Sequence, residues 1–498
     1  MPALTPYQQL EQEFRRLDAL RGAAGLLRWD AAVMMPHDSA DGRADQLAAL
    51  DAECHAILIS PRVSRLLERA AANSHGLEDW QHANLREMRR QRDRAIQLPA
   101  NLISRLARAT ARAEILWSDA RRAQDFALLA PTLAEVVTLV RDKSHLLGAA
   151  LGVEPYDALV DEFSPGLKQD EIESLFRGLT ARLPGLIHRA IDEQGPPPPA
   201  LAGRFPLSRQ RQFASELMRT LGFRFERGRL DESEHPFTGG APGDTRVTAR
   251  FDPSDPLNGI LVVLHEAGHA LYDQGLPAAW RGQPVGRDRG MAVHESQSLL
   301  FEMVLGRSLP FATWLGPKLE RAFGTSGADF APEALHARMT YVARGPIRVD
   351  ADELTYNVHV MLRYDLEQRL LSGELRVTDL PEAWQAELEG RLGVSPANAA
   401  EGCLQDVHWA AGAFGYFPCY TVGAMLAGQL YETLRGSLPG LDEDLAHGRF
   451  GPVVEWLRTE IHESGSSLPL GELVESATGR PLSALPWLRY VEGKYLPG

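Results

Sequence analysis

Apolar residues recur at helical spacing along most of the chain. The first segment with this pattern spans residues 6–27, where leucine alternates with arginine and glutamate. The pattern continues in four further ranges rich in good helix formers, namely 40–72, 77–95, 98–125 and 130–150. It resumes at residue 257 and runs to the C-terminus. The spacing therefore predicts a mainly α-helical protein.

One region, residues 222–252, has the character of β-strands. Residues 223–225 read as a strand, residues 239–243 as a turn rich in glycine and proline, and residues 245–251 alternate with a period of two. We therefore expect a small antiparallel β-sheet immediately before the helix near residue 257. The edge of such a sheet can hold an extended peptide by main-chain hydrogen bonds.

No segment has the length or composition of a domain boundary. The four-proline run at 196–199 reads as a loop between helices. We expect a single unit over residues 1–498, with a helical N-terminal portion of about 1–220 and an active-site portion of about 221–498. The two portions are expected to form lobes around a cleft.

Charge and cysteine content exclude several classes of function. The formal net charge of −14 argues against a nucleic-acid or anionic-membrane partner. The three cysteines are far apart, so neither a disulfide framework nor a cysteine metal site is expected. The first residues lack the pattern of a signal peptide, and no apolar run approaches the ~18 residues of a membrane span. A soluble cytoplasmic protein is expected.

The most informative stretch is an H-E-x-x-H motif inside an apolar helical pattern. His265 and His269 stand at i and i+4, so both rings leave one face of a helix and can converge on one metal ion. Glu266 follows the first histidine and can act as the general base for the water that the metal activates. This arrangement is typical of a zinc hydrolase.

The residues around the motif carry the start and stop signals of a helix. Asp255 suits the N-cap and Pro256 the first helical position. Gly275 and Pro277 provide the stop signals. The motif is therefore expected on a regular helix, as its chemistry requires.

A catalytic zinc ion needs a third protein ligand. The longer motif H-E-x-x-H-x-x-G-x-x-H is excluded, because Tyr272 and Gly275 stand where it needs glycine and histidine. The third ligand must then come from another segment. Glu295 is expected in the first turn of a second helix and can complete a His-His-Glu site, whereas its neighbour His294 points elsewhere on that helix.

Six motifs keep their order along the chain: H-P-F at 235–237, D-x-R-x-T at 244–248, H-E-x-x-H at 265–269, H-E-S-Q at 294–297, I-R-x-x-A-D-E at 347–353 and G-x-x-Q-D-x-H-W at 402–409. Together they resemble the M32 metallocarboxypeptidases, the carboxypeptidase Taq family. The resemblance implies a mostly helical fold with a long deep cleft, related to neurolysin and angiotensin-converting enzyme. It also implies a homodimer, one zinc or cobalt ion per subunit, and removal of single residues from peptides with a free C-terminus.

A carboxypeptidase must bind the terminal carboxylate of its substrate, and arginine is the best bidentate partner. Arg348 is the first candidate, because Ile347 and Ala351 indicate an apolar setting. Arg246, on the strand edge, is the second. For both, the alternative is a buried structural ion pair with a nearby aspartate, namely Asp350, Asp352 or Asp244.

The tetrahedral oxyanion needs a hydrogen-bond donor besides the metal. The candidates are His235, His408 and Tyr420. Asp406 could orient His408, and Asp244 could orient a metal-ligating histidine. For Tyr356 and His359, core packing is the expectation.

Two other functions stay open from the sequence. One is an oligopeptidase or dipeptidyl carboxypeptidase of the same His-His-Glu class. Arg348 discriminates here, because an endopeptidase has no use for a carboxylate anchor near the metal. The other is an inactive metal-binding scaffold. The intact Glu266 argues against the scaffold, because a structural zinc site is closed and needs no base.

Overall fold

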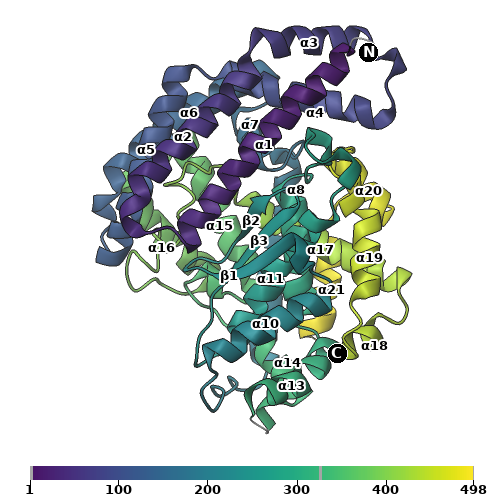
Figure 1. The fold of residues 1–498 in the computed structure, drawn as a ribbon. Helices are drawn as coiled ribbons and strands as arrows, with labels where there is room; N and C mark the ends of the chain where they lie inside the picture. Colours follow the sequence, from purple (N-terminus) through teal and green to yellow (C-terminus); the bar gives the residue numbers. More distant parts are fainter. Residues whose placement is uncertain (1–3, 325–327, 497–498) are drawn as a thin grey trace.

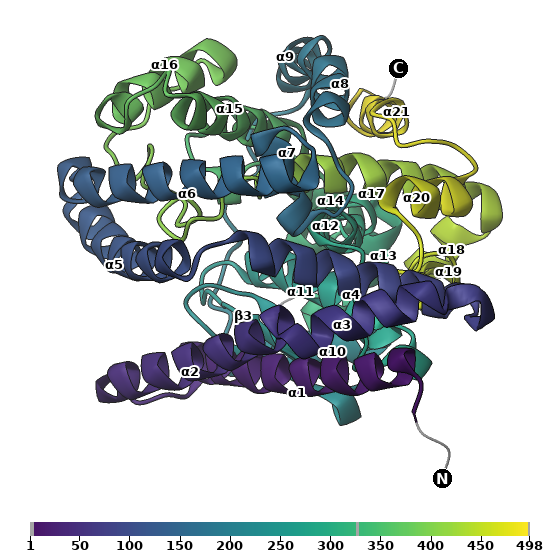
Figure 2. The same ribbon diagram turned by 90° about the horizontal axis from the view of Figure 1, so that it is seen from above.

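The computed structural model describes residues 4–324 and 328–496. The protein is mainly helical, as the spacing predicts, and its N-terminal part is a set of long helices (Figure 1, Figure 2). These are α1 (Pro6–Val33), α2 (Ala40–Ile59), α3 (Pro61–Ala72), α4 (Asp79–Gln97), α5 (Ala100–Ala123), α6 (Ala130–Leu151), α7 (Pro155–Phe163), α8 (Gln169–Thr180), α9 (Leu183–Glu193) and α10 (Leu207–Leu221).

The expected range 40–72 contains two helices because Ser60 and Pro61 interrupt it. Ser60 has an extended backbone with ψ of 141°, and its hydroxyl accepts a hydrogen bond from the Val63 amide at 3.2 Å. Pro61 has no amide hydrogen to continue the preceding helix, but it suits the first position of the next one. The break is therefore a paired stop and start signal.

The sheet has three strands, β1 (Gly228–Glu232), β2 (Thr238–Ala241) and β3 (Asp244–Ala249), in the order β1-β3-β2. β2 runs antiparallel to β3, but β1 runs parallel to it. The expectation of an antiparallel sheet is therefore wrong for β1. The reason is the connection 233–237, which crosses to the other side of β3, where the Thr248 amide donates to the Phe237 carbonyl at 2.9 Å.

Two local predictions in this region are also wrong. Residues 223–225 are not a strand, because the rings of Phe223 and Phe225 pack edge to face at 4.9 Å and a 3-10 helix begins at Phe225. Residues 239–241 are part of β2, which leaves only Pro242 and Gly243 for the turn. The glycines here allow close packing: a Cβ at Gly25 of α1 would collide with the carbonyl oxygen of Gly240.

The sheet lies between α1 and the helix that carries the H-E-x-x-H motif, α11 (Pro256–Gly275) (Figure 1). Val247 and Ala249 are fully buried on one side of β3. On the other side, the guanidinium group of Arg246 stacks on the ring of Trp29 in α1, 4.2 Å from its centroid. Strand β2 contacts α11 directly, because the hydroxyl of Thr238 donates to the main-chain carbonyl of Glu266 at 3.0 Å.

The helix over Pro256–Gly275 has the predicted caps. The Asp255 carboxylate accepts a hydrogen bond from the Leu257 amide at 2.9 Å, and Pro256 occupies the first turn. The helix ends at Gly275, two residues before Pro277. The predicted helical context of the motif is confirmed.

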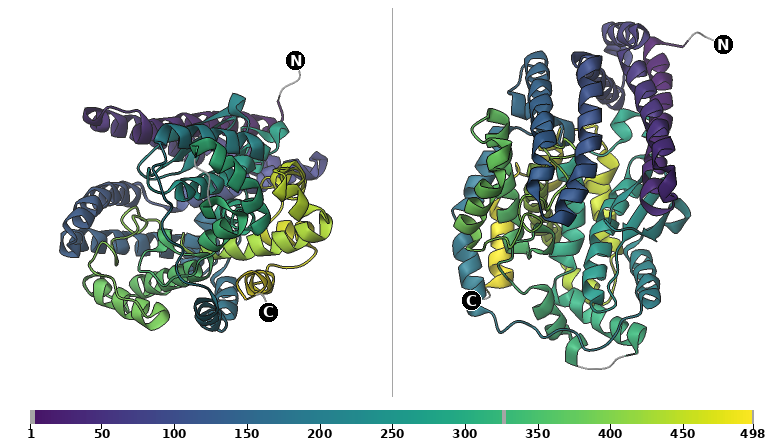
Figure 3. Two further views of the ribbon diagram at one scale, coloured as in Figure 1. Left: turned by 90° about the horizontal axis from the view of Figure 1, so that it is seen from below. Right: turned by 90° about the vertical axis from the view of Figure 1, so that its left-hand side faces the viewer.

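The rest of the chain is again mostly helical. The N-terminal and C-terminal helices, α1 and α21, lie on different sides of the molecule (Figure 3). Two irregular stretches, 340–352 and 393–417, interrupt the helices and carry two of the six motifs. The elements are α12 (Met291–Leu299), a π-helical segment (Leu300–Leu305), α13 (Leu309–Phe323), α14 (Pro332–Met339), α15 (Glu353–Ser372), α16 (Leu380–Leu392), α17 (Pro418–Ser437), α18 (Leu441–Ala446), α19 (Gly451–Glu460), α20 (Leu470–Thr478) and α21 (Leu485–Tyr495).

Helix α21 is tied to the centre of the molecule by a buried lysine. The ammonium group of Lys494 donates to a carboxylate oxygen of Glu353 at 2.8 Å and to the carbonyl oxygen of Met303 at 2.9 Å. Met303 lies in the π-helical segment, and Glu353 begins α15. Helix α21 therefore holds the start of α15 and the π-helical segment, and the latter packs against the helix of the metal-binding motif.

The apolar side chains form two clusters. The larger one runs from Leu102 to Val491 and surrounds α11, α12 and α17. The smaller one belongs to α1–α4 and includes Leu10, Phe14 and Met88. Within the described residues, no helix combines the length and the hydropathy needed to cross a membrane.

Candidate active site

His265 and His269 lie on one face of α11, with ring centroids 4.9 Å apart. The helix is buried on most sides because it packs against the sheet and α12. Gly268, inside the motif, permits this packing: a Cβ there would lie 2.6 Å from the carbonyl oxygen of Gln297 in α12. The motif therefore needs its glycine for the approach of the two helices.

Glu295 of α12 completes the group. Its Oε2 lies 3.8 Å from Nε2 of His265 and 3.8 Å from Nε2 of His269, and its side chain is 3% exposed. The helix begins at Met291, so Glu295 lies in the second turn and not in the first turn as expected. Helix α17 presses on this position, since a Cβ at Gly423 would lie 2.7 Å from the Cβ of Glu295.

His265, His269 and Glu295 form a candidate metal-binding group, and their donor atoms fit a divalent ion. All three lie within 4.8 Å of one another. Imidazole nitrogen and carboxylate oxygen bind zinc at about 2.0–2.2 Å, so two ligand atoms of a tetrahedral site stand about 3.4 Å apart. The donor chemistry also suits the ion, because two imidazoles and one carboxylate leave a coordination position open.

His265 is oriented by a carboxylate that the sequence analysis did not assign. Its Nδ1 faces Oε2 of Glu302 at 2.9 Å, and Oε1 of Glu302 accepts from Arg307 at 2.8 Å. Although burial raises the pKa of Glu302, the hydrogen bond from His265 and the charge of Arg307 lower it below its ordinary value. Glu302 stands seven residues after Glu295, a helical spacing that was available in the sequence.

His269 is oriented by its neighbour on α12. Its Nδ1 lies 2.5 Å from Nδ1 of His294, whose Nε2 faces the carboxylate of Asp273 at 3.2 Å. The expectation that His294 points away from the ligands is wrong in this respect: it is not a ligand of the group, but it contacts one. The aspartate behind His269 is therefore Asp273, which acts through His294, and not Asp244.

Glu266 lies buried beside the three ligand residues, 6% exposed. Its Oε2 accepts a hydrogen bond from the hydroxyl of Thr238 in β2 at 2.7 Å. Burial raises the pKa of its carboxyl above the ordinary value. Strand β2 therefore orients the Glu266 carboxylate.

Arg348 is also buried, at 6% exposure, in the irregular stretch before α15. Its Nε and one terminal nitrogen donate to Oδ1 of Asp406 at 3.1 and 2.7 Å, and the other terminal nitrogen donates to the hydroxyl of Tyr356 at 3.2 Å. Arg363 donates to the second oxygen of Asp406 at 2.6 Å. The ion-pair partner is Asp406 and not Asp350 or Asp352.

The charge of Arg348 reaches the metal-binding group. Its guanidinium lies 4.8 Å from the ring centroid of Tyr420, and its charge contributes to lowering the pKa of Glu295. Burial nevertheless dominates and leaves that pKa raised. Arg348 is therefore the candidate anchor that the fold brings to the site.

Arg246 is held away from it. The guanidinium makes two hydrogen bonds to Asp244 of the same strand, at 3.0 and 2.7 Å, and stacks on Trp29. These contacts match the alternative of a structural ion pair. Asp244 has its carboxylate in this pair, and among the described residues it makes no contact with a histidine of the metal-binding group.

The three candidate oxyanion donors are not equivalent. Nε2 of His408 faces the hydroxyl of Tyr420 at 3.2 Å, and burial lowers the pKa of His408 to about 4. Tyr416, which the sequence analysis missed, donates to Oε1 of Glu295 at 3.4 Å. His235 instead is exposed in the connection 233–237, and its only described hydrogen bond is made by its carbonyl oxygen.

Asp406 does not orient His408 as expected. Its two oxygens accept from Arg348 and Arg363, and Nδ1 of His408 has no hydrogen-bond partner among the described residues. The charges of these two arginines lower the pKa of Asp406 far below its ordinary value, although burial raises it. Tyr356 contacts Arg348 through its hydroxyl, so core packing describes it only in part, whereas His359 is fully buried.

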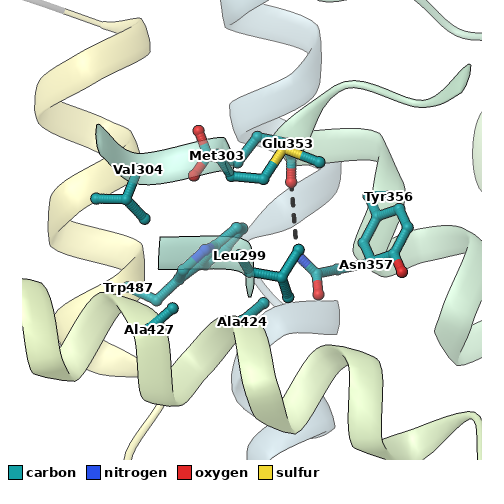
Figure 4. A pocket seen from close by; sticks show the side chains of 9 residues that line it. All are labelled: Leu299, Met303, Val304, Glu353, Tyr356, Asn357, Ala424, Ala427 and Trp487. Atoms are coloured by element: carbon teal, nitrogen blue, oxygen red, sulfur yellow. Dashed lines mark hydrogen bonds between the residues drawn. The ribbon is translucent and has the colours of Figure 1, made fainter. Parts of the chain in front are cut away.

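A small cavity lies behind Tyr356 (Figure 4). Its volume of about 10 Å³ accommodates no more than one water molecule, so it cannot take an amino-acid side chain. Asn357 donates across it to the carbonyl oxygen of Glu353 at 3.5 Å. The lining residues are Leu299, Met303, Val304, Glu353, Tyr356, Asn357, Ala424, Ala427 and Trp487.

Comparisons with known proteins match this geometry to one family. The family model described as carboxypeptidase Taq (M32) metallopeptidase matches residues 9–495. Thermostable carboxypeptidase 1 of Thermus thermophilus is 39% identical over 500 residues, which cover 98% of both chains. Among solved structures, metallocarboxypeptidase 1 of Trypanosoma cruzi has a TM-score of 0.96 at 36% identity and 99% coverage of both chains.

A second solved structure agrees. The M32 carboxypeptidase of Deinococcus radiodurans R1 has a TM-score of 0.93 at 35% identity and covers 98% of both chains. These matches span the described fold from α1 to α21 and include the segments that carry the metal-binding group. The chain therefore belongs to the carboxypeptidase Taq (M32) family of metallopeptidases and is a metal-dependent carboxypeptidase.

Proposed function

We propose that the protein removes single amino acids from the C-termini of peptides, with His265, His269 and Glu295 holding one zinc ion, or alternatively cobalt. The observation that carries the proposal is the convergence of these three side chains beside a buried carboxylate base and a buried arginine. When bound, such an ion lowers the pKa of water and polarises a carbonyl group. The chain's own residues supply the other functions.

Glu266 is the proposed general base. Its carboxylate takes a proton from the attacking water and later delivers it to the leaving amine. The hydroxyl of Thr238 fixes one of its oxygens at 2.7 Å, so the other oxygen stays available for the proton transfer. The raised pKa supports this role, because a base that must also return its proton works best when its pKa is near the working pH.

Arg348 is the proposed anchor for the terminal carboxylate of the substrate. A guanidinium group has five N–H donors. Asp406 and Tyr356 take three of them, which leaves one on each terminal nitrogen. Two such donors side by side match the two oxygens of a carboxylate. Arg246 is the second candidate, and its case is weakened by its ion pair with Asp244 on the same strand and by its stacking on Trp29 of α1.

The oxyanion that forms at the scissile carbonyl needs a donor, and His408 with Tyr420 provides the proposed pair. Burial keeps His408 neutral at neutral pH, so it can accept from or donate to the Tyr420 hydroxyl. Tyr416 is an added candidate because its hydroxyl already touches Glu295. For His235 to act as the oxyanion donor, the connection 233–237 has to move toward the site when substrate binds.

The proposal extends to the arrangement of the whole chain. We infer a single peptidase domain, with a helical portion of about 1–220 and an active-site portion of about 221–498 around a long, deep cleft similar to that of neurolysin and angiotensin-converting enzyme. A cytoplasmic homodimer with one ion per subunit is the inferred assembly. Light scattering and elemental analysis of the purified protein test the assembly and the metal content.

The decisive experiment compares two peptides that differ only at the C-terminus, one a free acid and the other an amide. Mass spectrometry of the products should show loss of one residue from the acid and little turnover of the amide. Release of dipeptides would indicate a dipeptidyl carboxypeptidase, and internal cleavage of both peptides an oligopeptidase. The Glu266→Gln variant, purified identically, controls for contaminating peptidases.

A further inference from the structure

A cavity next to the metal-binding group has no role in the proposed function. Its volume is about 200 Å³, and it lies between the β2–β3 turn, the end of α11 and the segment that leads into α12. The turn contributes residues 239–243, and the segment contributes residues 281–288 in part. Five of the lining residues are glycines, so main-chain atoms form much of the wall.

The cavity continues directly from the catalytic residues along two elements. Thr238 touches Glu266, and the next residues of β2 line the cavity. His269 belongs to the metal-binding group, and Asp273, one helical turn later, lines the cavity. A helical turn rises about 5.4 Å and a strand about 3.3 Å per residue, so the cavity lies about two to three peptide residues from the metal-binding group.

The cavity and Arg348 lie at opposite ends of one chain of contacts. From the cavity wall, Asp273 contacts His294, which contacts His269, which faces Glu295. Beyond Glu295 the contacts run through Tyr416 to the ring of Tyr420, 5.3 Å away, and on to Arg348. The metal-binding group stands between the two ends. Thr238 of β2 contacts Glu266, and the next residues of β2 line the cavity, so a peptide that extends from Arg348 past Glu266 along β2 reaches the cavity.

Two charged side chains of the cavity wall have neither a hydrogen bond nor an ion pair among the described residues, and both are positive. Arg287 pairs with Asp18, and Asp273 pairs with His294, while the Asp288 carboxylate accepts from the Gly290 amide. The guanidinium groups of Arg227 and Arg281 have no hydrogen bond or ion pair among the described residues.

Both of these arginines are exposed, and Arg281 extends over the turn. A Cβ at Gly243 would lie 3.4 Å from the Cζ of Arg281, so the glycine, with φ of +88°, leaves the space beside that guanidinium open. The two arginines can therefore meet a ligand without breaking an existing contact.

We propose that this cavity binds the second and third residues before the scissile bond and that Arg227 and Arg281 select acidic side chains there. This specificity rests on the proposed function, because it needs a peptide anchored at Arg348. The preferred substrates are then peptides with glutamate or aspartate shortly before the C-terminal residue. Solvent-exposed ion pairs contribute modestly, so the selection is a preference and not an absolute requirement.

The test uses free-acid peptides that are identical except for glutamate, glutamine or lysine at the second or third residue before the scissile bond. At low salt, kcat/KM should be about tenfold higher for glutamate than for lysine, and the difference should shrink at high salt because salt screens exposed charges. The double variant Arg227→Gln, Arg281→Gln should lose this preference and keep its rate on the glutamine peptide. Arg209→Gln removes one exposed charge from α10 and should change nothing.

Each outcome decides the matter. Equal rates on all three peptides in the unmodified protein would overturn the selection while leaving the carboxypeptidase function intact. An equal loss on all three peptides in the double variant would show that the arginines act on structure and would also overturn it. No cleavage of any peptide would overturn the proposed function and the selection together.

Discussion

The two ends of the site are built in different ways. At the metal-binding end, the three donor residues and Glu302 come from α11, α12 and the π-helical segment, all within residues 265–302. At the other end, Arg348, Asp406 and Tyr420 come from three segments, and the first two lie in irregular stretches. Helical spacing brings the residues of the first end together, whereas tertiary packing brings the residues of the second end together.

In the proposed function, this difference separates general from selective chemistry. Water activation is needed for every peptide bond, whatever the substrate carries at its C-terminus. Carboxylate binding distinguishes one class of substrate from another. Changes at the metal-binding end should therefore reduce turnover of all substrates, and changes at the Arg348 end should reduce turnover according to the C-terminal group.

The largest effect should follow Glu266→Gln. The variant should lose about 10³-fold or more in kcat on every peptide, because it cannot take the proton from water. It should keep its metal, because Glu266 is not among the donor atoms of the group. Turnover and elemental analysis on the same preparation measure both. Loss of metal together with activity would reassign Glu266 to the ligands and blur the comparison.

Arg348→Ala tests the selective end. Removal of a desolvated charge-assisted contact costs on the order of 2–5 kcal/mol, so kcat/KM for free-acid peptides should fall about 30-fold or more. Amidated peptides should change little, and Arg348→Lys should recover part of the loss. The fold should survive, because Asp406 keeps Arg363 as a partner.

The matched comparison is Arg246→Ala, which removes an arginine that is also paired with an aspartate and stacked on an aromatic ring. It should affect acid and amide peptides equally. The two roles would be exchanged if Arg246→Ala lowered kcat/KM only for free-acid peptides and Arg348→Ala lowered it equally for acid and amide peptides.

A smaller effect is expected from Glu302→Gln, which tests whether the metal-binding end depends on the residues behind the ligands. The amide can still accept a hydrogen bond from His265, but the negative charge is lost. Metal affinity should fall about tenfold, at the lower end of the usual range for such partners, and activity should return at higher metal concentration. Unchanged affinity in a chelator competition would limit the metal-binding end to its three donors.

The smallest effect concerns stability. Burial lowers the pKa of His359, on α15 near Arg348, to about 3, below the ordinary 6.5. The unfolded chain then takes up a proton that the folded protein refuses, so this contribution to stability is complete above pH 6.5 and is lost as the pH falls toward 3. The slope is about 1.4 kcal/mol per pH unit for one proton.

His359→Leu should remove that slope from the free energy of unfolding, measured by chemical denaturation between pH 6 and pH 4.5. The exposed His75→Gln variant serves as its control and should leave the pH dependence unchanged. An unchanged slope in His359→Leu would mean that the buried histidine does not contribute to acid sensitivity.

The sequence predicts the metal-binding end well for a physical reason. Helical periodicity places His265 and His269 on one face, and the caps at Asp255 and Gly275 are local signals. Glu295 follows from the need for a third ligand. The error in its helical position shows that the start of a helix without a side-chain cap, as at Gly290, is hard to locate from the sequence.

The Arg348 end and the sheet were less predictable. Asp406 was assigned to His408, its neighbour in sequence, but the fold pairs it with two arginines that lie more than forty residues away along the chain. Likewise, local alternation indicated strands near residues 222–252 but could not show that β1 would run parallel to β3. Both errors arise where the partner lies on another element, because spacing along one segment carries no information about its partner.

Lys494 is synthesised after every residue of the site, yet its ammonium group holds the carbonyl oxygen of Met303 in the segment that also carries Glu302. While the chain emerges from the ribosome, the helix with the H-E-x-x-H motif is exposed to the cell well before α21 exists. Completion of this support must therefore wait until α21 has been synthesised. The metal-binding motif thus appears in the growing chain before the helix that supports its surroundings.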